Sequence, residues 1–185
     1  MDENKNPWTT LKSELKYENS WICLTEHQVI NPSGGDGIYG VVSFKNLAMG
    51  VLPLDENLNT WLVGQYRYAL NQYSWEIPEG GGKLTTNPLD SAKRELLEET
   101  GLKADRWTQI QEMYLSNSVS DEKAIIYVAQ GLSQHEPEPE ETEQLIVKKL
   151  PFQQVFDMVM NGQITDSITV AAVLKVKILL DTDRI

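Results

Sequence analysis

Three glutamates stand close together in this 185-residue chain, at positions 95, 98 and 99. In a helix, the spacing i, i+3, i+4 would place the carboxylates of Glu95, Glu98 and Glu99 on one side. Like charges so placed repel by roughly 0.2–0.5 kcal/mol per pair, and interspersed lysines would relieve that repulsion. Converging carboxylates are, however, the oxygen ligands that a hard divalent cation such as Mg²⁺ requires. The spacing therefore predicts a metal site, and a solvated acidic helix face is the plainer alternative.

The residues around these glutamates predict the helix that would position them. Asn87 can cap a helix, Pro88 suits its first position, and Asp90 complements the helix dipole in the first turn. Gly101 is a natural stop because it tolerates the left-handed conformation. We therefore expect one helix over residues 88–100, with an apolar side formed by Leu89, Ala92, Leu96 and Leu97.

The segment from Gly80 to Leu102 resembles the Nudix box of the Nudix hydrolases. That motif is a glycine, five residues, a glutamate, seven residues, then Arg-Glu-aliphatic-x-Glu-Glu-x-Gly-aliphatic. The matching positions are Gly80, Arg94, Glu95, Leu96, Glu98, Glu99, Gly101 and Leu102. Thr86 stands where the motif has its first glutamate, so the resemblance implies metal binding that is weakened or altered but not removed.

The resemblance also implies roles for the residues of the box. Glu95, Glu98 and Glu99 would hold Mg²⁺, with Mn²⁺ as a substitute, and Glu98 would count among the catalytic carboxylates. The glycines at 80, 81 and 82 let the backbone approach a ligand closely, and a carbonyl at Gly80 would be a further metal ligand. Arg94 would orient the glutamates, and Gly101 would support the box structurally.

The stretch that leads into the box resembles the ADP-ribose pyrophosphatase branch of the family. It contains Gln65-Tyr66-Arg67 and then Trp-Glu-Ile-Pro from position 75. The resemblance implies that Arg67 and Trp75 bind the nucleotide, since arginine can fork onto a phosphate and an aromatic ring can stack on a base. A surface arginine and a core aromatic residue are the alternative interpretation.

Two segments after the box hold further candidates. Residues 116–122 resemble the same branch but lack its proline near positions 117 and 118, which argues against strict ADP-ribose specificity. We expect Glu122 to reach the substrate, or the segment to serve only as a capped turn.

The acidic stretch 135–143 would be a solvated loop on composition alone. In the resembling enzymes, a loop at this place carries the base that activates water. We interpret Glu141 as the general base and Glu143 as an added metal ligand, with Glu138 and Glu140 as competing candidates.

The composition of the chain bears on which partners and which cellular location we expect. The formal net charge is −11, which repels nucleic-acid phosphates, so we do not expect a polymeric nucleic-acid substrate. No apolar run reaches the length of a membrane span, and the amino-terminal residues contain no apolar signal region, so we expect a cytoplasmic protein. The lone cysteine, Cys23, reads as a small hydrophobic residue, and His27 and His135 lack metal-ligand spacing.

The remaining elements are expected from turn residues and β-forming runs. We expect a short helix or an extended arm over 8–15, and a plausible hairpin formed by 48–54 and 60–68. The other expected elements are two short strands within 16–30, strands over 38–44, 108–115 and 123–129, and helices over 152–160 and from 166 or 167 to 180.

Together these features predict an α/β fold, the α/β/α sandwich around a mixed β-sheet that the resemblance implies. We expect a single domain over 1–185, with residues 1–30 as an arm or small sheet that contributes to a homodimer. The expected activity is Mg²⁺-dependent hydrolysis of nucleoside diphosphate sugars, ADP-ribose or hexose-linked, to a nucleoside monophosphate and a sugar phosphate. The alternatives are a Nudix hydrolase of nucleoside triphosphates or dinucleoside polyphosphates, and a non-catalytic nucleotide sensor.

Overall fold

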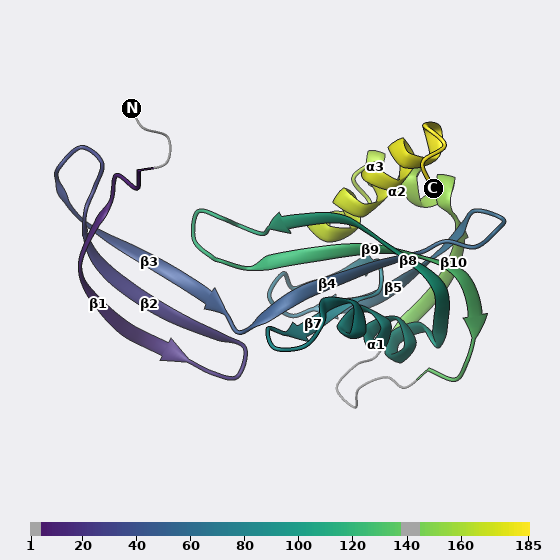
Figure 1. The fold of residues 1–185 in the computed structure, drawn as a ribbon, viewed down its shortest axis with the longest axis horizontal. Helices are drawn as coiled ribbons and strands as arrows, with labels where there is room; N and C mark the ends of the chain where they lie inside the picture. Colours follow the sequence, from purple (N-terminus) through teal and green to yellow (C-terminus); the bar gives the residue numbers. More distant parts are fainter. Residues whose placement is uncertain (1–4, 138–144) are drawn as a thin grey trace. The chain divides into compact units, whose positions relative to one another are not determined.

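A computed structural model describes residues 5–137 and 145–185 of the chain (Figure 1). The chain forms two compact units. The first is Met1–Asn46 together with Tyr114–Glu122, and the second is Leu47–Met113 together with Lys123–Ile185. A segment from the middle of the sequence thus belongs to the amino-terminal unit.

The first unit is a three-stranded antiparallel sheet in the order β1-β2-β3. Its strands are β1 (Thr9–Glu18), β2 (Ile22–Ile30) and β3 (Asp36–Phe44). The helical alternative for residues 8–15 is wrong, because this stretch is extended and pairs with β2. The turn before β3 forms around Asn31, whose Oδ1 accepts hydrogen bonds from the N–H groups of Ser33 and Gly35 at 2.9 and 3.1 Å.

Residues 114–122 cover the free edge of β3. The Val42 N–H donates to the Val119 carbonyl at 2.8 Å, and the Phe44 N–H donates to Asp121 Oδ1 at 2.8 Å. The Tyr39 hydroxyl donates to the Ser118 carbonyl at 2.6 Å. These bonds explain why the segment belongs to the first unit.

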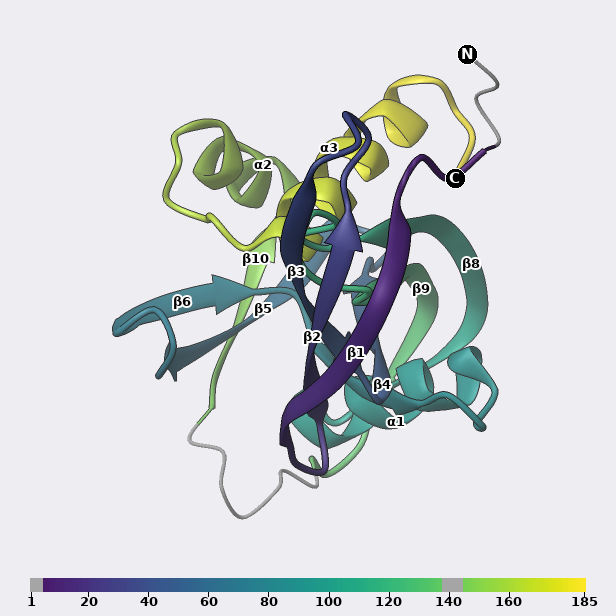
Figure 2. The same cartoon turned by 90° about the vertical axis from the view of Figure 1, so that its left-hand side faces the viewer.

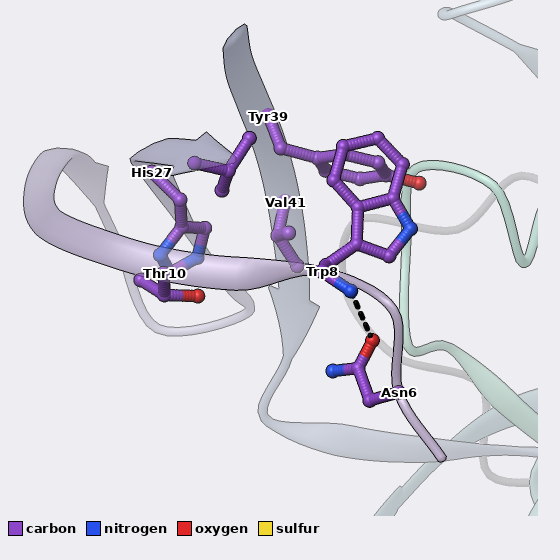
Figure 3. Close-up of a pocket in the computed structure, with 7 residues that line it drawn as sticks. Asn6, Trp8, Thr10, His27, Tyr39 and Val41 are labelled. Carbon is purple, nitrogen blue, oxygen red and sulfur yellow. Dashed lines mark hydrogen bonds between the residues drawn. The ribbon is translucent and has the colours of Figure 1, made fainter. Parts of the chain in front are cut away.

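One face of this sheet carries a pocket of about 280 Å³ (Figure 3). Strand alternation places its lining residues on the same face, and the Trp8 and Tyr39 rings meet edge-on at 5.2 Å. Trp8 is fixed by the bond from its N–H to Asn6 Oδ1 at 3.0 Å. The lining residues are Asn6, Trp8, Thr10, His27, Val29, Tyr39 and Val41.

The second unit contains two sheets. The four-stranded sheet has the order β7-β4-β9-β8, and the three-stranded sheet has the order β10-β5-β6. Strands β4 and β9 run parallel, whereas β5 is antiparallel to both of its neighbours, so the unit combines both kinds of pairing. The strands are β4 (Asn46–Pro53), β5 (Asn59–Arg67), β6 (Gln72–Glu76), β7 (Glu79–Lys83), β8 (Leu102–Tyr114), β9 (Lys123–Gln134) and β10 (Ile146–Pro151).

The predicted hairpin of 48–54 and 60–68 is wrong, although both strands exist. β4 pairs with β7 and β9, and β5 pairs with β6 and β10. The intervening residues turn tightly because Asp55 Oδ1 accepts from the N–H groups of Asn57 and Asn59. Met49, Val51 and Leu52 are fully buried, which suits a strand covered on both faces rather than one arm of a hairpin.

Three helices complete the second unit: α1 (Pro88–Thr100), α2 (Phe152–Met160) and α3 (Ser167–Asp181). α1 lies on one side of the strands, and α2 and α3 lie on the other (Figures 1 and 2). The predicted sandwich of helices around a mixed sheet is therefore confirmed. Among the residues described, no helix has both the length and the apolar character to cross a membrane.

The core beneath α1 explains the helix's position. Ala92 and Leu96 are fully buried and pack with Met49 and Val51 of β4. Burying a side chain of the size of Leu96 contributes about 1.5–3 kcal/mol, so α1 is anchored by its apolar side. Its acidic residues are thereby held at a fixed position against the sheet.

Candidate active site

The helix that carries the three glutamates forms over the residues predicted. Asn87 Oδ1 accepts from the Leu89 N–H at 3.0 Å, and the Gly101 N–H donates to the Leu97 carbonyl at 2.8 Å. Gly101 has φ 70°, the left-handed conformation expected of a helix stop. A side chain there would also meet the His135 carbonyl oxygen at 2.4 Å, so glycine is required twice over.

The start of β7 lies directly against this helix. A Cβ added at Gly80 would be 2.3 Å from both Cδ and Oε2 of Glu95, so any larger residue here would have to displace the Glu95 carboxylate. The Glu79 N–H donates to Glu99 Oε2 at 3.0 Å. Gly80 therefore allows the backbone to lie close to the Glu95 carboxylate, whereas the expected approach of the glycine run to a ligand stays a prediction.

Arg94 gathers the acidic groups. Its Nη1 donates to Glu98 Oε2 at 2.5 Å, and its Nη2 donates to Glu95 Oε1 at 2.5 Å and to the Gly81 carbonyl at 2.9 Å. Burial alone would lower the pKa of Arg94, but Glu95 and Glu98 offset it and raise that pKa. The Arg94 guanidinium thus joins two box carboxylates to the backbone of β7 at Gly81.

The donor set fits a divalent cation. Glu95 and Glu99 are only 7% and 4% exposed, and Glu98 is half-buried beside them. Oxygen ligands from carboxylates and nearby carbonyls are what Mg²⁺ and its relatives take. Arg94 Nη2 bonds both Glu95 and the Gly81 carbonyl, so a backbone carbonyl of β7 lies near the same carboxylates.

A second acidic cluster lies at the other end of the Glu79 side chain. Carboxylate oxygens of Glu76, Glu79 and Asp166 lie within 4.8 Å of one another. Arg67 Nε donates to both oxygens of Glu76 at 2.9 and 3.0 Å, and its Nη2 also bonds Glu76 and donates to Glu79 Oε1 at 2.9 Å. Glu79 Oε2 is buried with no hydrogen-bond partner among the described residues.

The charges of this cluster shift one another. Burial raises the pKa of Glu79 well above its ordinary value, Asp166 and Glu76 raise it further, and Arg67 opposes them. For Arg67, burial would lower the pKa, but pairing with Glu76 outweighs it and raises that pKa. The side chains of Glu76 and Glu79 were not predicted to form a cluster. The sequence held no signal for this cluster, because its members meet only once β5, β6 and β7 are in place.

The structure places the other predicted residues as follows. Trp75 precedes Glu76 on β6, so its side chain lies on the opposite strand face, against Tyr73 and beneath the Lys148 ammonium at 4.1 Å. Glu122 is half-buried in the first unit, and burial raises its pKa. Thr86 is exposed in the turn before α1, where its N–H donates to the Lys83 carbonyl. Glu141, Glu143, Glu138 and Glu140 lie outside the described residues.

Comparison with protein-family models identifies both parts of the chain. Residues 8–42 match the nucleoside diphosphate sugar hydrolase N-terminal domain, and residues 45–167 match the NUDIX domain. The chain belongs to the Nudix family. Since α1 and β7 lie within the matched Nudix domain, the glutamates joined by Arg94 are those of its Nudix box.

Relatives of this Nudix protein match along most of its length. An ADP-ribose pyrophosphatase of Mycobacterium tuberculosis is 31% identical over 175 residues, 93% of this chain and 84% of the relative. A methanol dehydrogenase activator of Bacillus methanolicus is 29% identical over 166 residues, 89% of each protein. The crystal structure of an ADP compounds hydrolase superposes with a TM-score of 0.86 over the full length of both chains, at 20% identity, which supports the fold.

Proposed function

We propose that this Nudix hydrolase cleaves the pyrophosphate bond of nucleoside diphosphate sugars, of which ADP-ribose is the type compound, in a reaction that uses Mg²⁺. The products are a nucleoside monophosphate and a sugar phosphate. The observation that carries the proposal is the assembly of Glu95, Glu98 and the Gly81 carbonyl around Arg94, beside the Glu79–Glu99 hydrogen bond. The relatedness to an ADP-ribose pyrophosphatase supports the choice of substrate class.

The roles of the residues follow from this arrangement. Glu95, Glu98 and Glu99, with a carbonyl at Gly80, would hold Mg²⁺, which when bound offsets the charge of the pyrophosphate and lowers the pKa of water. Water adds to one phosphorus, and the bond from that phosphorus to the bridging oxygen breaks. Arg94 holds the carboxylates in place and does not itself react.

The base and the substrate contacts are proposed from the sequence resemblance. Glu141 would accept the proton of the attacking water, and Glu143 would add a metal ligand. Trp75 and Glu122 would contact the substrate. An aromatic ring such as that of Trp75 can contribute about 1–3 kcal/mol by stacking on a base.

A panel of substrates tests the activity. Purified protein is offered ADP-ribose, ADP-glucose, GDP-mannose, UDP-glucose, diadenosine tetraphosphate and the nucleoside triphosphates, each with and without Mg²⁺. We expect metal-dependent release of a nucleoside monophosphate from the sugar-linked compounds. Turnover of triphosphates alone, or binding without any turnover, would contradict the proposal.

Matched variants test the metal site. Glu99→Gln removes a buried carboxylate of the box, and we expect activity to fall by at least about 100-fold, at the upper end of losses seen when metal-site groups are changed. Glu56→Gln makes the same chemical change at an exposed turn and should retain full activity. Glu99→Gln activity within a few-fold of the unmodified protein would refute the metal assignment.

We also propose that the protein is a homodimer joined through its amino-terminal unit. Strand β1 is exposed along its whole length and carries Leu11, Leu15 and Tyr17, each more than half exposed. We take these three side chains as part of an apolar patch, because contiguous apolar surface marks protein–protein interfaces. Light scattering should give twice the monomer mass, and Leu11→Ser with Leu15→Ser should reduce it, whereas Leu70→Ser in the second unit should not.

A further inference from the structure

Arg67 is held by the carboxylates of Glu76 and Glu79. Its guanidinium makes a two-oxygen contact with Glu76, whose side chain is 3% exposed, and a further bond to Glu79. Among the described residues, Arg67 is the one cation paired with these two glutamates. Moving Arg67 onto a substrate phosphate would leave Glu76 buried and unpaired, which is strongly unfavourable.

The backbone of Glu79 links this cluster to the box. The Glu79 side chain receives the Arg67 bond at 2.9 Å, while the Glu79 N–H donates to Glu99 Oε2 at 3.0 Å. The next residue, Gly80, lies against the Glu95 carboxylate. A displacement of Glu79 would therefore shift both the hydrogen bond to Glu99 and the contact with Glu95.

Two arginines thus bracket the start of β7. Arg94 holds the Gly81 carbonyl from α1 at 2.9 Å, and Arg67 holds the Glu79 side chain from the end of β5. The carbonyls of Glu79 and Gly80 lie between these two fixed points in the sequence. Because both anchors are charge-assisted hydrogen bonds, they restrict this short segment more than neutral contacts would.

We propose that Arg67 is a positioning residue for the metal site. It acts by fixing Glu79, so that the start of β7 keeps its hydrogen bond to Glu99 and its contact with Glu95. This assigns Arg67 a role other than phosphate binding. The proposal rests on the proposed metal-dependent function. It predicts that loss of Arg67 weakens metal binding even when no substrate is present.

The experiment compares Arg67→Ala, Glu79→Ala and the control Arg106→Ala, an exposed arginine on β8. Mn²⁺ binding is titrated by electron paramagnetic resonance without substrate, and KM for ADP-ribose is measured at saturating metal. Glu79→Ala keeps the Arg67–Glu76 pair intact. If circular dichroism shows that Arg67→Ala does not fold, the Mn²⁺ affinity of Glu79→Ala alone tests the proposal.

We expect both test variants to bind Mn²⁺ at least about 10-fold more weakly, as is typical when groups that orient metal ligands are lost. Their KM at saturating metal should stay within about 3-fold, and Arg106→Ala should change neither quantity. Unchanged Mn²⁺ affinity in Glu79→Ala, or in a folded Arg67→Ala whose KM rises 10-fold, would overturn the proposal and return Arg67 to phosphate binding. Failure of the unmodified protein to bind Mn²⁺ would instead refute the metal-dependent function itself, and the inference with it.

Discussion

The contact between Gly80 and Glu95 makes a quantitative prediction. In Gly80→Ala, the new Cβ would be 2.3 Å from Glu95 Cδ and Oε2, about 1.1 Å closer than the 3.4 Å limit of ordinary contact. Glu95 cannot easily move aside, because it is 7% exposed and bound to Arg94. Overpacking of this kind costs about 1–3 kcal/mol, so we expect the free energy of unfolding without metal to fall by that amount.

The same substitution should also reduce stabilisation by metal, since it displaces a carboxylate that we assign to the metal. At a concentration 100 times its Kd, a ligand that binds only the folded state stabilises it by about 2.7 kcal/mol. A tenfold loss of affinity would lower that gain to about 1.4 kcal/mol at the same concentration. Urea unfolding of both proteins, with and without Mg²⁺, measures the two effects separately.

Gly40→Ala is the matched control for this prediction. A Cβ at Gly40 in β3 would meet no atom within 4 Å, so the same chemical change should not destabilise the protein; it should raise stability by about 0.4–1 kcal/mol through the unfolded chain and leave the dependence on metal unchanged. If Gly80→Ala kept the full stabilisation by Mg²⁺, the assignment of Glu95 and the backbone of β7 at Gly80 to one metal site would be refuted.

Two further predictions concern stability. Gly101→Ala should lower the free energy of unfolding by about 2–5 kcal/mol, through left-handed strain plus the collision with the His135 carbonyl. Gly162 has the same φ of 70° but open space around it, so Gly162→Ala should cost only the strain, about 1–2 kcal/mol. Equal losses of the two variants in urea unfolding would refute the collision. Burial would raise the pKa of Asp55, but the Lys149 ion pair at 2.8 Å and hydrogen bonds from Asn59 and Asn57 lower it from 3.8 to about 2. Because the pKa of Asp55 is lower in the folded state, its carboxylate contributes stability that is present above about pH 4 and is lost as the pH falls toward 2. Asp55→Asn should therefore lower the free energy of unfolding by about 2 kcal/mol at pH 7 and by almost nothing at pH 2. A difference that does not change with pH would contradict the lowered pKa.

The sequence predicted local elements well where the signals were themselves local. α1 begins and ends at the predicted residues because Asn87, Pro88 and Gly101 act through bonds within one turn. The end of α2 and the cap of α3 follow the same logic, with Asp166 accepting from the Thr169 N–H at 2.7 Å. The box glutamates were found for the same reason, since their helical spacing alone brings them together.

What could not be predicted depends on contacts between distant residues. β4 pairs with β9, more than 70 residues later, rather than with the next strand, and period-2 patterns carry no information on the partner. The length of β8 was underestimated, because residues 102–107 are not a typical apolar strand run. Likewise, no spacing rule shows that Arg67 meets Glu79, since the meeting requires β5, β6 and β7 to be in place.

The segment that covers the edge of β3 has a consequence for synthesis of the protein. β3 is complete at Phe44, but Val119 and Asp121, which bond Val42 and Phe44, lie in a segment that ends at Glu122. At about 5–20 residues per second, a ribosome needs about 4–16 s to make the intervening chain. During that interval the nascent β3 has unpaired backbone groups, which are a template for pairing with a neighbouring chain. Crowded polysomes are therefore where misassembly of this protein should begin, and slower translation between residues 45 and 122 should increase it.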